Sequence, residues 1–230
     1  MITFGGIQKN SFIDYPGKLS AVLFVSGCNF TCPYCHNPDL AKGKLPHPLT
    51  EDQAYDFLDM RKGFLEAVVL SGGEPSLCKD IYRICRCIRS MGYPIKLDTN
   101  GSRPQVLENL LKEKIIDYVA MDIKTDPAQY GPPLAPPRSG VDILKSIDLL
   151  MSGHTPYEFR TTCVAPFVTP AIMRRIGRYL KGASAYFLQP FQSGSVPLPD
   201  HCSDVSTKTT DLESLRAVVA TFVPTCEVRA

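Results

Sequence analysis

Segments typical of β-strands and segments typical of α-helices alternate along most of this chain. Strands are predicted at 20–26, 66–70, 95–99, 118–123, 157–164 and 185–188. Helices are predicted at 50–60, 81–91, 104–113, 141–151 and 170–180, and residues 50–53 (TEDQ) predict a capping box at the start of the first. Repeated strand–helix units favour an α/β fold with a parallel sheet, and six strands are fewer than the eight of a complete TIM barrel. The sequence therefore predicts a partial, TIM-like (β/α)6 barrel.

The length of the chain fits one large domain better than two. A chain of 230 residues can bury one sizeable core. We expect a single domain over 1–230, with its core at about 15–192 and an irregular tail at 193–230 that contains a short helix near 212–222. The segment 126–140 contains five prolines and is predicted to be a surface loop.

Composition and charge argue against several classes of protein. The net charge of +2 gives no basic surface for nucleic acid. No apolar run approaches the roughly 20 residues of a membrane-spanning helix, and the first residues lack the features of a signal peptide. We therefore expect a cytoplasmic protein without nucleic-acid or membrane partners. Its nine cysteines cannot all pair within one chain, which favours metal ligation by some of them.

Polar residues follow the predicted strands at their carboxyl ends, where ligands bind in parallel α/β sheets. They are Cys28, Gly72-Gly73-Glu74, Asp98-Thr99-Asn100-Gly101, Asp122 with Lys124, and Gln189, and Arg160 lies within the fifth strand. Their repeated occurrence at this edge predicts one active site.

Three cysteines, Cys28, Cys32 and Cys35, form a CxxxCxxC array after the first predicted strand. Structural zinc sites and electron-transfer 4Fe–4S clusters usually have four protein ligands. Three thiolates would leave one iron of a 4Fe–4S cluster open for chemistry. A zinc site completed by His36 or a distant cysteine is the alternative. The other cysteines form no tight array and are expected to be small hydrophobes or free thiols: Cys78, Cys85, Cys87, Cys163, Cys202 and Cys226.

The cysteine array, with an aromatic residue before its third cysteine, resembles the signature of the radical S-adenosylmethionine (radical SAM) superfamily. The segments 14–18 (DYPGK) and 27–38 (GCNFTCPYCHNP) are similar to those of glycyl-radical-enzyme activating proteins. Among these, the chain is most similar to activators of anaerobic ribonucleoside-triphosphate reductase. The resemblance implies one 4Fe–4S cluster and bound SAM, flavodoxin or ferredoxin as electron donor, and a glycyl radical enzyme as protein substrate.

The resemblance also implies roles for individual residues in binding SAM. Gly72, Gly73 and Glu74 match the family's GGE motif, whose glycines let the backbone approach the methionine amine. Tyr34 and His36 would lie near the adenine, although packing within the loop is an alternative for both. Gln189 occupies a position where pyruvate formate-lyase activators carry histidine.

Further residues at the strand ends match two patterns of the activating enzymes. By resemblance, Asp98, Thr99 and Asp122 would help to bind a monovalent cation beside the SAM carboxylate. Lys124 is expected by the same resemblance to help to bind SAM. The alternative for Asp98 is an Asx turn, and for Lys124 a surface charge. Arg160 is a charge within a strand, and a buried arginine requires a partner, so contact with SAM or with a protein partner is expected.

Three other functions remain open at the level of sequence. The chain could be an activase of the pyruvate formate-lyase type, a radical SAM enzyme that acts on a small molecule, or a non-enzymatic metal-binding module.

Overall fold

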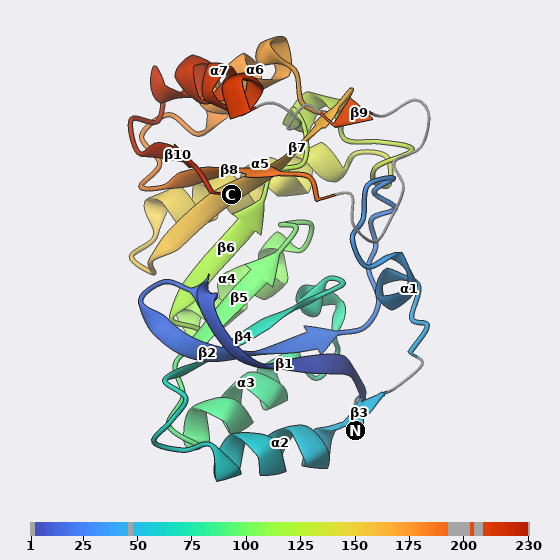
Figure 1. Ribbon diagram of the computed structural model, residues 1–230, viewed down its shortest axis with the longest axis vertical. Helices are drawn as coiled ribbons and strands as arrows, with labels where there is room; N and C mark the ends of the chain where they lie inside the picture. The colour runs from blue at the N-terminus through green and yellow to red at the C-terminus, as the bar shows by residue number, and fades with distance from the viewer. Residues whose placement is uncertain (1–2, 46–47, 193–202, 205–208, 230) are drawn as a thin grey trace. The chain divides into compact units, whose positions relative to one another are not determined.

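The computed structural model describes residues 3–45, 48–192, 203–204 and 209–229, which form two compact units (Figure 1). The first unit contains Met1–Asn29, Asn37–Thr99 and Gln105–Val119, and the second contains Phe30–His36, Asn100–Pro104 and Ala120–Ala230. The cysteine triplet is therefore divided, with Cys28 in the first unit and Cys32 and Cys35 in the second.

The first unit is built on a mixed sheet. Its strands are β1 (Thr3–Tyr15), β2 (Lys18–Val25), β3 (Leu49–Thr50), β4 (Ala67–Gly72) and β5 (Ile95–Thr99). The order across the sheet is β5-β4-β2-β1-β3, in which β2, β4 and β5 are parallel and β1 is antiparallel to β2 and β3. Val69 of β4 lies opposite Val22 of β2 and Lys96 of β5. This register brings the carboxyl ends of three parallel strands to one edge.

Helices of the first unit follow its strands. They are α1 (Pro38–Ala41), α2 (Glu51–Met60), the 3-10 turn η1 (Pro75–Leu77), α3 (Ile81–Ser90) and α4 (Pro104–Lys112). In Figure 1, α2 and α3 lie side by side along the same face of the sheet. The predicted capping box is confirmed, because the Thr50 hydroxyl accepts from the N–H of Gln53 and the Gln53 side chain accepts from the N–H of Thr50.

Strand β6 (Tyr118–Asp122) starts in the first unit, just after Asp117, whose N–H donates to the carbonyl of Ile95 (2.8 Å). It ends in the second unit, where the N–H of Ile123 donates to Arg160 (2.8 Å). The other strands of the second unit are β7 (Tyr157–Ala165), β8 (Tyr186–Pro190), β9 (Ser203–Asp204) and β10 (Cys226–Val228). Strands β7, β8 and β10 are parallel, and β9 is antiparallel to β7.

Helical elements of the second unit are η2 (Pro127–Gln129), α5 (Ser139–Ser152), α6 (Pro170–Tyr179) and α7 (Thr209–Ala220). Helices α6 and α7 pack against one another (Figure 1). Gly177 permits this approach, since a Cβ there would lie 2.6 Å from the ring of Phe222. The packing of α7 explains why the helix predicted near 212–222 forms.

The six predicted strands correspond to β2, β4, β5, β6, β7 and β8, and each end of the predicted helices lies within three residues of the observed end. The long strand β1 was missed, since its register shifts interrupt the alternation of apolar and polar residues. In the tail, the short helix predicted near 212–222 forms as α7, and the residues after it, predicted to be irregular, form β10 on the edge of β8. Most of the remainder of the tail lies outside the described residues. The single domain over 1–230 stays a prediction.

Candidate active site

In the first unit, Cys28 follows β2 and its backbone is fixed by α1. The N–H of Gly27 donates to the carbonyl of Leu40 (3.0 Å), and the N–H of Cys28 donates to that of Ala41 (2.9 Å). The Cys28 residue is half-buried. The first cysteine of the triplet is therefore held on ordered backbone and stays accessible.

The glycine pair after β4 packs directly on the backbone that leads to Cys28. A Cβ on Gly72 would lie 2.5 Å from the carbonyl oxygen of Val25, and Gly72 has a φ of +114°. A Cβ on Gly73 would lie 2.0 Å from the carbonyl oxygen of Gly27. Both positions therefore require glycine for close contact between two loops, a reason that adds to the one predicted for ligand binding.

Glu74 is fully buried, and its carboxylate accepts hydrogen bonds from its own loop and from β5. Its Oε1 accepts hydrogen bonds from the Ser76 N–H (3.0 Å), the Ser76 hydroxyl (2.5 Å) and the Thr99 hydroxyl (2.8 Å). Its N–H donates to Gly27 (2.8 Å). These contacts tie the glycine turn to the end of β5, and they place Glu74 and Thr99 together as sequence analysis expected of one edge.

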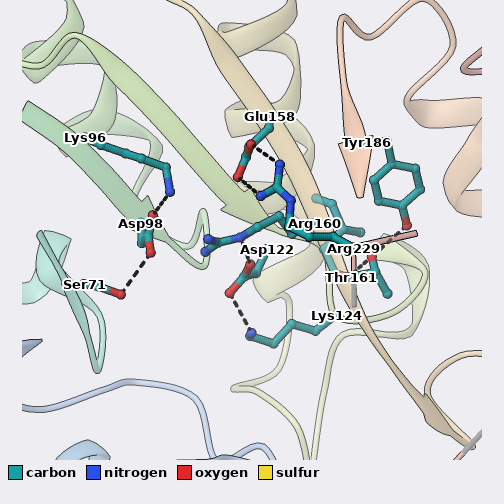
Figure 2. Close-up of polar contacts among 11 residues, drawn as sticks. Ser71, Lys96, Asp98, Asp122, Lys124, Glu158, Arg160, Thr161, Tyr186 and Arg229 are labelled. Atoms are coloured by element: carbon teal, nitrogen blue, oxygen red, sulfur yellow. Dashed lines mark hydrogen bonds and ion pairs between the residues drawn. The ribbon is translucent and has the colours of Figure 1, made fainter. Parts of the chain in front are cut away.

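Asp98 at the end of β5 has an ion-pair partner that sequence analysis did not identify. Lys96 Nζ lies 2.8 Å from Asp98 Oδ1, and the Ser71 hydroxyl donates to Oδ2 (3.0 Å), as Figure 2 shows. The Lys96 side chain is 1% exposed. Its signal was a charged residue between Ile95 and Leu97 of an apolar strand, two positions from Asp98 and so on the same face.

An Asx turn is present two residues after Asp98 and is made by Asn100. In the second unit the N–H of Ser102 donates to the Asn100 side-chain oxygen (2.9 Å). Gly101 follows with a φ of +74°, the left-handed conformation that such a turn needs.

The segment with Cys32 and Cys35 belongs to the second unit. The Cys35 N–H donates to the Cys32 carbonyl (3.1 Å), which closes a tight turn between the two cysteines. Before them, Thr31 donates to Leu134 from its N–H (3.0 Å) and to Pro133 from its hydroxyl (2.6 Å). Both cysteines are half-buried. The proline-rich loop predicted at 126–140 thus fixes the backbone just before Cys32.

Tyr34 and His36 pack on aromatic side chains of the second unit. Tyr34 is 4% exposed, its ring centroid lies 5.5 Å from that of Phe167, and burial raises the pKa of its hydroxyl. The His36 ring stacks on Phe191 at 4.9 Å with an interplanar angle of 12°, and burial, followed by the charge of Lys124, lowers the pKa of the imidazole. Packing on Phe167 and Phe191 therefore fixes both rings.

Asp122 at the end of β6 has two cationic partners (Figure 2). Arg160 Nε lies 2.9 Å from Oδ1, and Lys124 Nζ lies 3.2 Å from Oδ2. Burial alone would raise the pKa of Asp122, but Arg160 and Lys124 outweigh it and lower the pKa to about 2. The carboxylate is therefore ionised at neutral pH.

Lys124 is an interior charge, so the structure decides against the alternative of a surface charge. Its side chain is 18% exposed and its N–H donates to the hydroxyl of Tyr130 (2.7 Å), another residue that sequence analysis missed. Burial alone would lower the pKa of Lys124, but Asp122 and then a thiolate at Cys32 raise it well above the ordinary value. Gln189 lies in β8, half-buried and opposite Thr162.

Among the described cysteines outside the triplet, Cys85, Cys163 and Cys226 are buried, and Cys78 and Cys87 are half-buried. Burial raises the pKa of Cys85 and of Cys226 to about 12, and Cys163 is fully buried. Cys202 lies outside the described residues. Over the described ranges, no three histidine, cysteine or acidic side chains gather around a single point as they would for one metal ion. Searched over the same ranges, no helix has the length and apolarity needed to cross a membrane.

Comparison with known proteins identifies the class. Residues 22–169 match the family model described as the radical SAM superfamily, and the chain belongs to this family. It is 40% identical over 194 residues to a Methanocaldococcus jannaschii protein named "Putative glycyl-radical enzyme activating enzyme MJ1227", covering 81% of this chain and 79% of that protein. It is 33% identical over 129 residues to the pyruvate formate-lyase-activating enzyme of Clostridium pasteurianum, covering 51% of this chain and 50% of that enzyme.

Solved structures support the fold. The structure of TYW1 with a lysine-pyruvate adduct bound aligns with a TM-score of 0.62 at 14% identity, covering 88% of this chain and 73% of that one. Streptococcus suis SuiB bound to S-adenosylmethionine aligns with a TM-score of 0.64 at 14% identity, covering 91% of this chain and 50% of that one. The α/β fold of the radical SAM type is therefore confirmed.

Membership of the radical SAM family implies a 4Fe–4S cluster and SAM, and the residues of this chain fit both. The three triplet cysteines are half-buried thiols at the CxxxCxxC spacing, and none of them lies in a disulfide. The glycine turn presents backbone with no side chain beside the Cys28 loop. The chain is thus an enzyme of the radical SAM class, which decides against a non-enzymatic zinc module.

Proposed function

We propose that this chain is an activase that generates a glycyl radical on a partner enzyme, and that the partner is anaerobic ribonucleoside-triphosphate reductase. The observation that carries the proposal is the Cys28, Cys32, Cys35 triplet in a radical SAM chain that is 40% identical to a protein named for glycyl-radical enzyme activation. The segment 14–18 favours the reductase as partner, because it resembles the activators of that enzyme.

Cys28, Cys32 and Cys35 would hold the cluster through thiolates. The cluster and SAM, when bound, supply reductive cleavage of the sulfonium and removal of one hydrogen atom from a glycine of the partner. The Gly72–Gly73 turn would offer backbone to the methionine amine of SAM.

In the second unit, Asp122, Lys124 and Arg160 together carry one positive charge, which would attract the SAM carboxylate. Tyr34, His36 and Gln189 would border the nucleoside, with the two aromatic rings fixed by their packing. The cation predicted at Asp98, Thr99 and Asp122 has weaker support, because Asp98 is already paired with Lys96.

An external one-electron donor is needed, for which we propose flavodoxin or ferredoxin. We also propose a cytoplasmic location. Its support is that all eight cysteines among the described residues are thiols, as in proteins of reducing compartments.

The activase proposal is tested by SAM cleavage. The protein is reconstituted with iron and sulfide without oxygen and then given dithionite and SAM, and 5′-deoxyadenosine is measured. Cys32→Ala should abolish the product, whereas Cys87→Ala, which removes a half-buried cysteine outside the triplet, should retain it. Equal product from wild type and Cys32→Ala would contradict the proposal.

The partner is tested by electron paramagnetic resonance. Incubation with anaerobic ribonucleotide reductase from the same source should give the doublet of a glycyl radical, and pyruvate formate-lyase should not. A doublet on pyruvate formate-lyase alone would replace the proposed partner. SAM cleavage without a doublet on either enzyme would favour a small-molecule substrate.

A further inference from the structure

The ion pair between Lys96 and Asp98 lies where the resemblance to activases implies a metal cation. Asp98 is the first residue of the 98–101 (DTNG) pattern, and the carboxylate was predicted to help bind a monovalent cation beside SAM. In the structure, each carboxylate oxygen of Asp98 already has a donor. Lys96 Nζ lies 2.8 Å from Oδ1, and the Ser71 hydroxyl donates to Oδ2 at 3.0 Å.

Burial makes this pair difficult to open. The Lys96 side chain is 1% exposed and that of Asp98 is 11% exposed, and both residues belong to β5. Separating the two groups would leave the Lys96 ammonium buried without its carboxylate partner and with little contact with water, which is costly in free energy. Lys96 therefore stays beside Asp98 when SAM or a cation arrives.

Charge then decides between the ammonium and a second cation. Lys96 and Asp98 together carry no net charge, so the attraction of the carboxylate for another cation is largely cancelled. A sodium or potassium ion at the same carboxylate would also be repelled by the ammonium at short range. One single positive charge is needed beside Asp98, and Lys96 already provides it.

We propose that the Lys96 ammonium takes the place of the monovalent cation at Asp98, so that SAM binding by this chain requires neither sodium nor potassium. The inference rests on the proposed function in assuming that SAM binds near the end of β5. It concerns a residue of this chain that neither the cysteine array nor the glycine motif identifies.

The test compares cation dependence in wild type and in Lys96→Met. SAM binding to the reconstituted protein is measured by anaerobic equilibrium dialysis in potassium, sodium or tetramethylammonium chloride at equal ionic strength. For wild type we expect the Kd to change by less than about twofold between salts. For Lys96→Met we expect a Kd about tenfold higher in tetramethylammonium chloride, restored by potassium or sodium. The Lys112→Met variant, which removes an exposed lysine paired with Glu108, should behave as wild type.

A second pair of measurements protects the test against loss of folding. Lys96→Met leaves a buried carboxylate without its cation, so the double variant Lys96→Met, Asp98→Asn is prepared as a neutral pair. Thallium NMR on each reconstituted protein reports monovalent cation binding directly and without catalysis. We expect line broadening with Lys96→Met and none with wild type or the double variant.

Three results would overturn the inference. They are a wild-type Kd for SAM that rises about tenfold when potassium is removed, thallium binding to wild type at the level of Lys96→Met, and a Lys96→Met protein with no gain in cation dependence. If wild type neither binds nor cleaves SAM in any salt, the proposed function fails, and thallium binding still decides the question at Asp98.

Discussion

Two aspartates, Asp98 and Asp122, end neighbouring strands in the sequence order of this fold, yet their surroundings differ. Asp98 in the first unit is paired with Lys96, whose side chain is 1% exposed. Asp122 in the second unit has two cations, Arg160 and Lys124, and its side chain is 31% exposed. The same residue type at the same kind of strand end thus has a balanced charge in one unit and an excess of positive charge in the other.

Because of this difference, we expect Asp98 to contribute mainly to stability and the group around Asp122 to contribute mainly to ligand binding. A neutral buried pair has little attraction for an ion, and its loss is felt mainly as instability. A partly exposed carboxylate with two cations leaves one positive charge for an anionic group such as a carboxylate. The predictions below test this contrast, starting from the largest expected effect.

The largest effect is expected for Asp98→Ala. The substitution leaves the Lys96 ammonium buried without this carboxylate and should lower the free energy of unfolding by about 3–5 kcal/mol. Urea denaturation followed by circular dichroism measures the change. Asp98→Asn, which keeps an oxygen acceptor for Lys96, should be less destabilising. If Asp98→Ala costs no more than Asp98→Asn, the pair is not the stabilising element that its burial implies.

Acid stability should depend on Asp122. Its pKa in the folded protein, about 2, is below the ordinary value of 3.8, so its stabilisation is present above about pH 4 and is lost as the pH falls toward 2. Asp122→Asn should reduce the acid loss of stability by about 1–2 kcal/mol, a value discounted for partial exposure. Denaturation at several pH values measures this. Asp142→Asn, at an exposed ion pair with Lys145, is the matched control and should leave the acid profile unchanged.

Lys124→Met should weaken SAM binding rather than folding. The substitution removes the excess positive charge and leaves Asp122 paired with Arg160, so we expect a Kd for SAM about tenfold higher. Anaerobic equilibrium dialysis at low and high salt measures the effect, and the loss should shrink as salt increases. Unchanged affinity for SAM would assign Lys124 a structural role. The Lys145→Met variant, which removes an exposed lysine, is the control for a change in net charge alone.

The smallest effect is expected at His36. Burial and the charge of Lys124 lower its pKa below 6.5, so its neutral form stabilises the protein above that pH and the contribution is lost as the pH falls below it. His36→Phe keeps the stack on Phe191 and should remove this pH dependence, which we expect to be under about 1 kcal/mol. An NMR titration of the imidazole that gave a pKa above 6.5 would contradict the prediction.

Several parts of the fold were predictable because their signals are local. The capping box at Thr50 and the six parallel strands depend on neighbouring residues, and all are confirmed. Strand β1 was missed because bulges disturb its alternation, and β10 because three residues give no periodic signal. Strand β10 is held in place by its pairing with β8. Arg229, which follows β10, donates two hydrogen bonds of 3.0 and 3.1 Å to the fully buried Glu158 (Figure 2).

The sequence by itself determined the class of this protein, because a cysteine triplet, a glycine pair and strand–helix repeats are read from short spacings along the chain. Only the tertiary structure decided how the charges are balanced. Lys96 and Asp98 meet because residues two apart in β5 point to the same face of the sheet. Arg160 contacts Asp122, which lies 38 positions away in the chain. Electrostatic energy depends on distance in space and on burial, and neither quantity is written in the order of the residues.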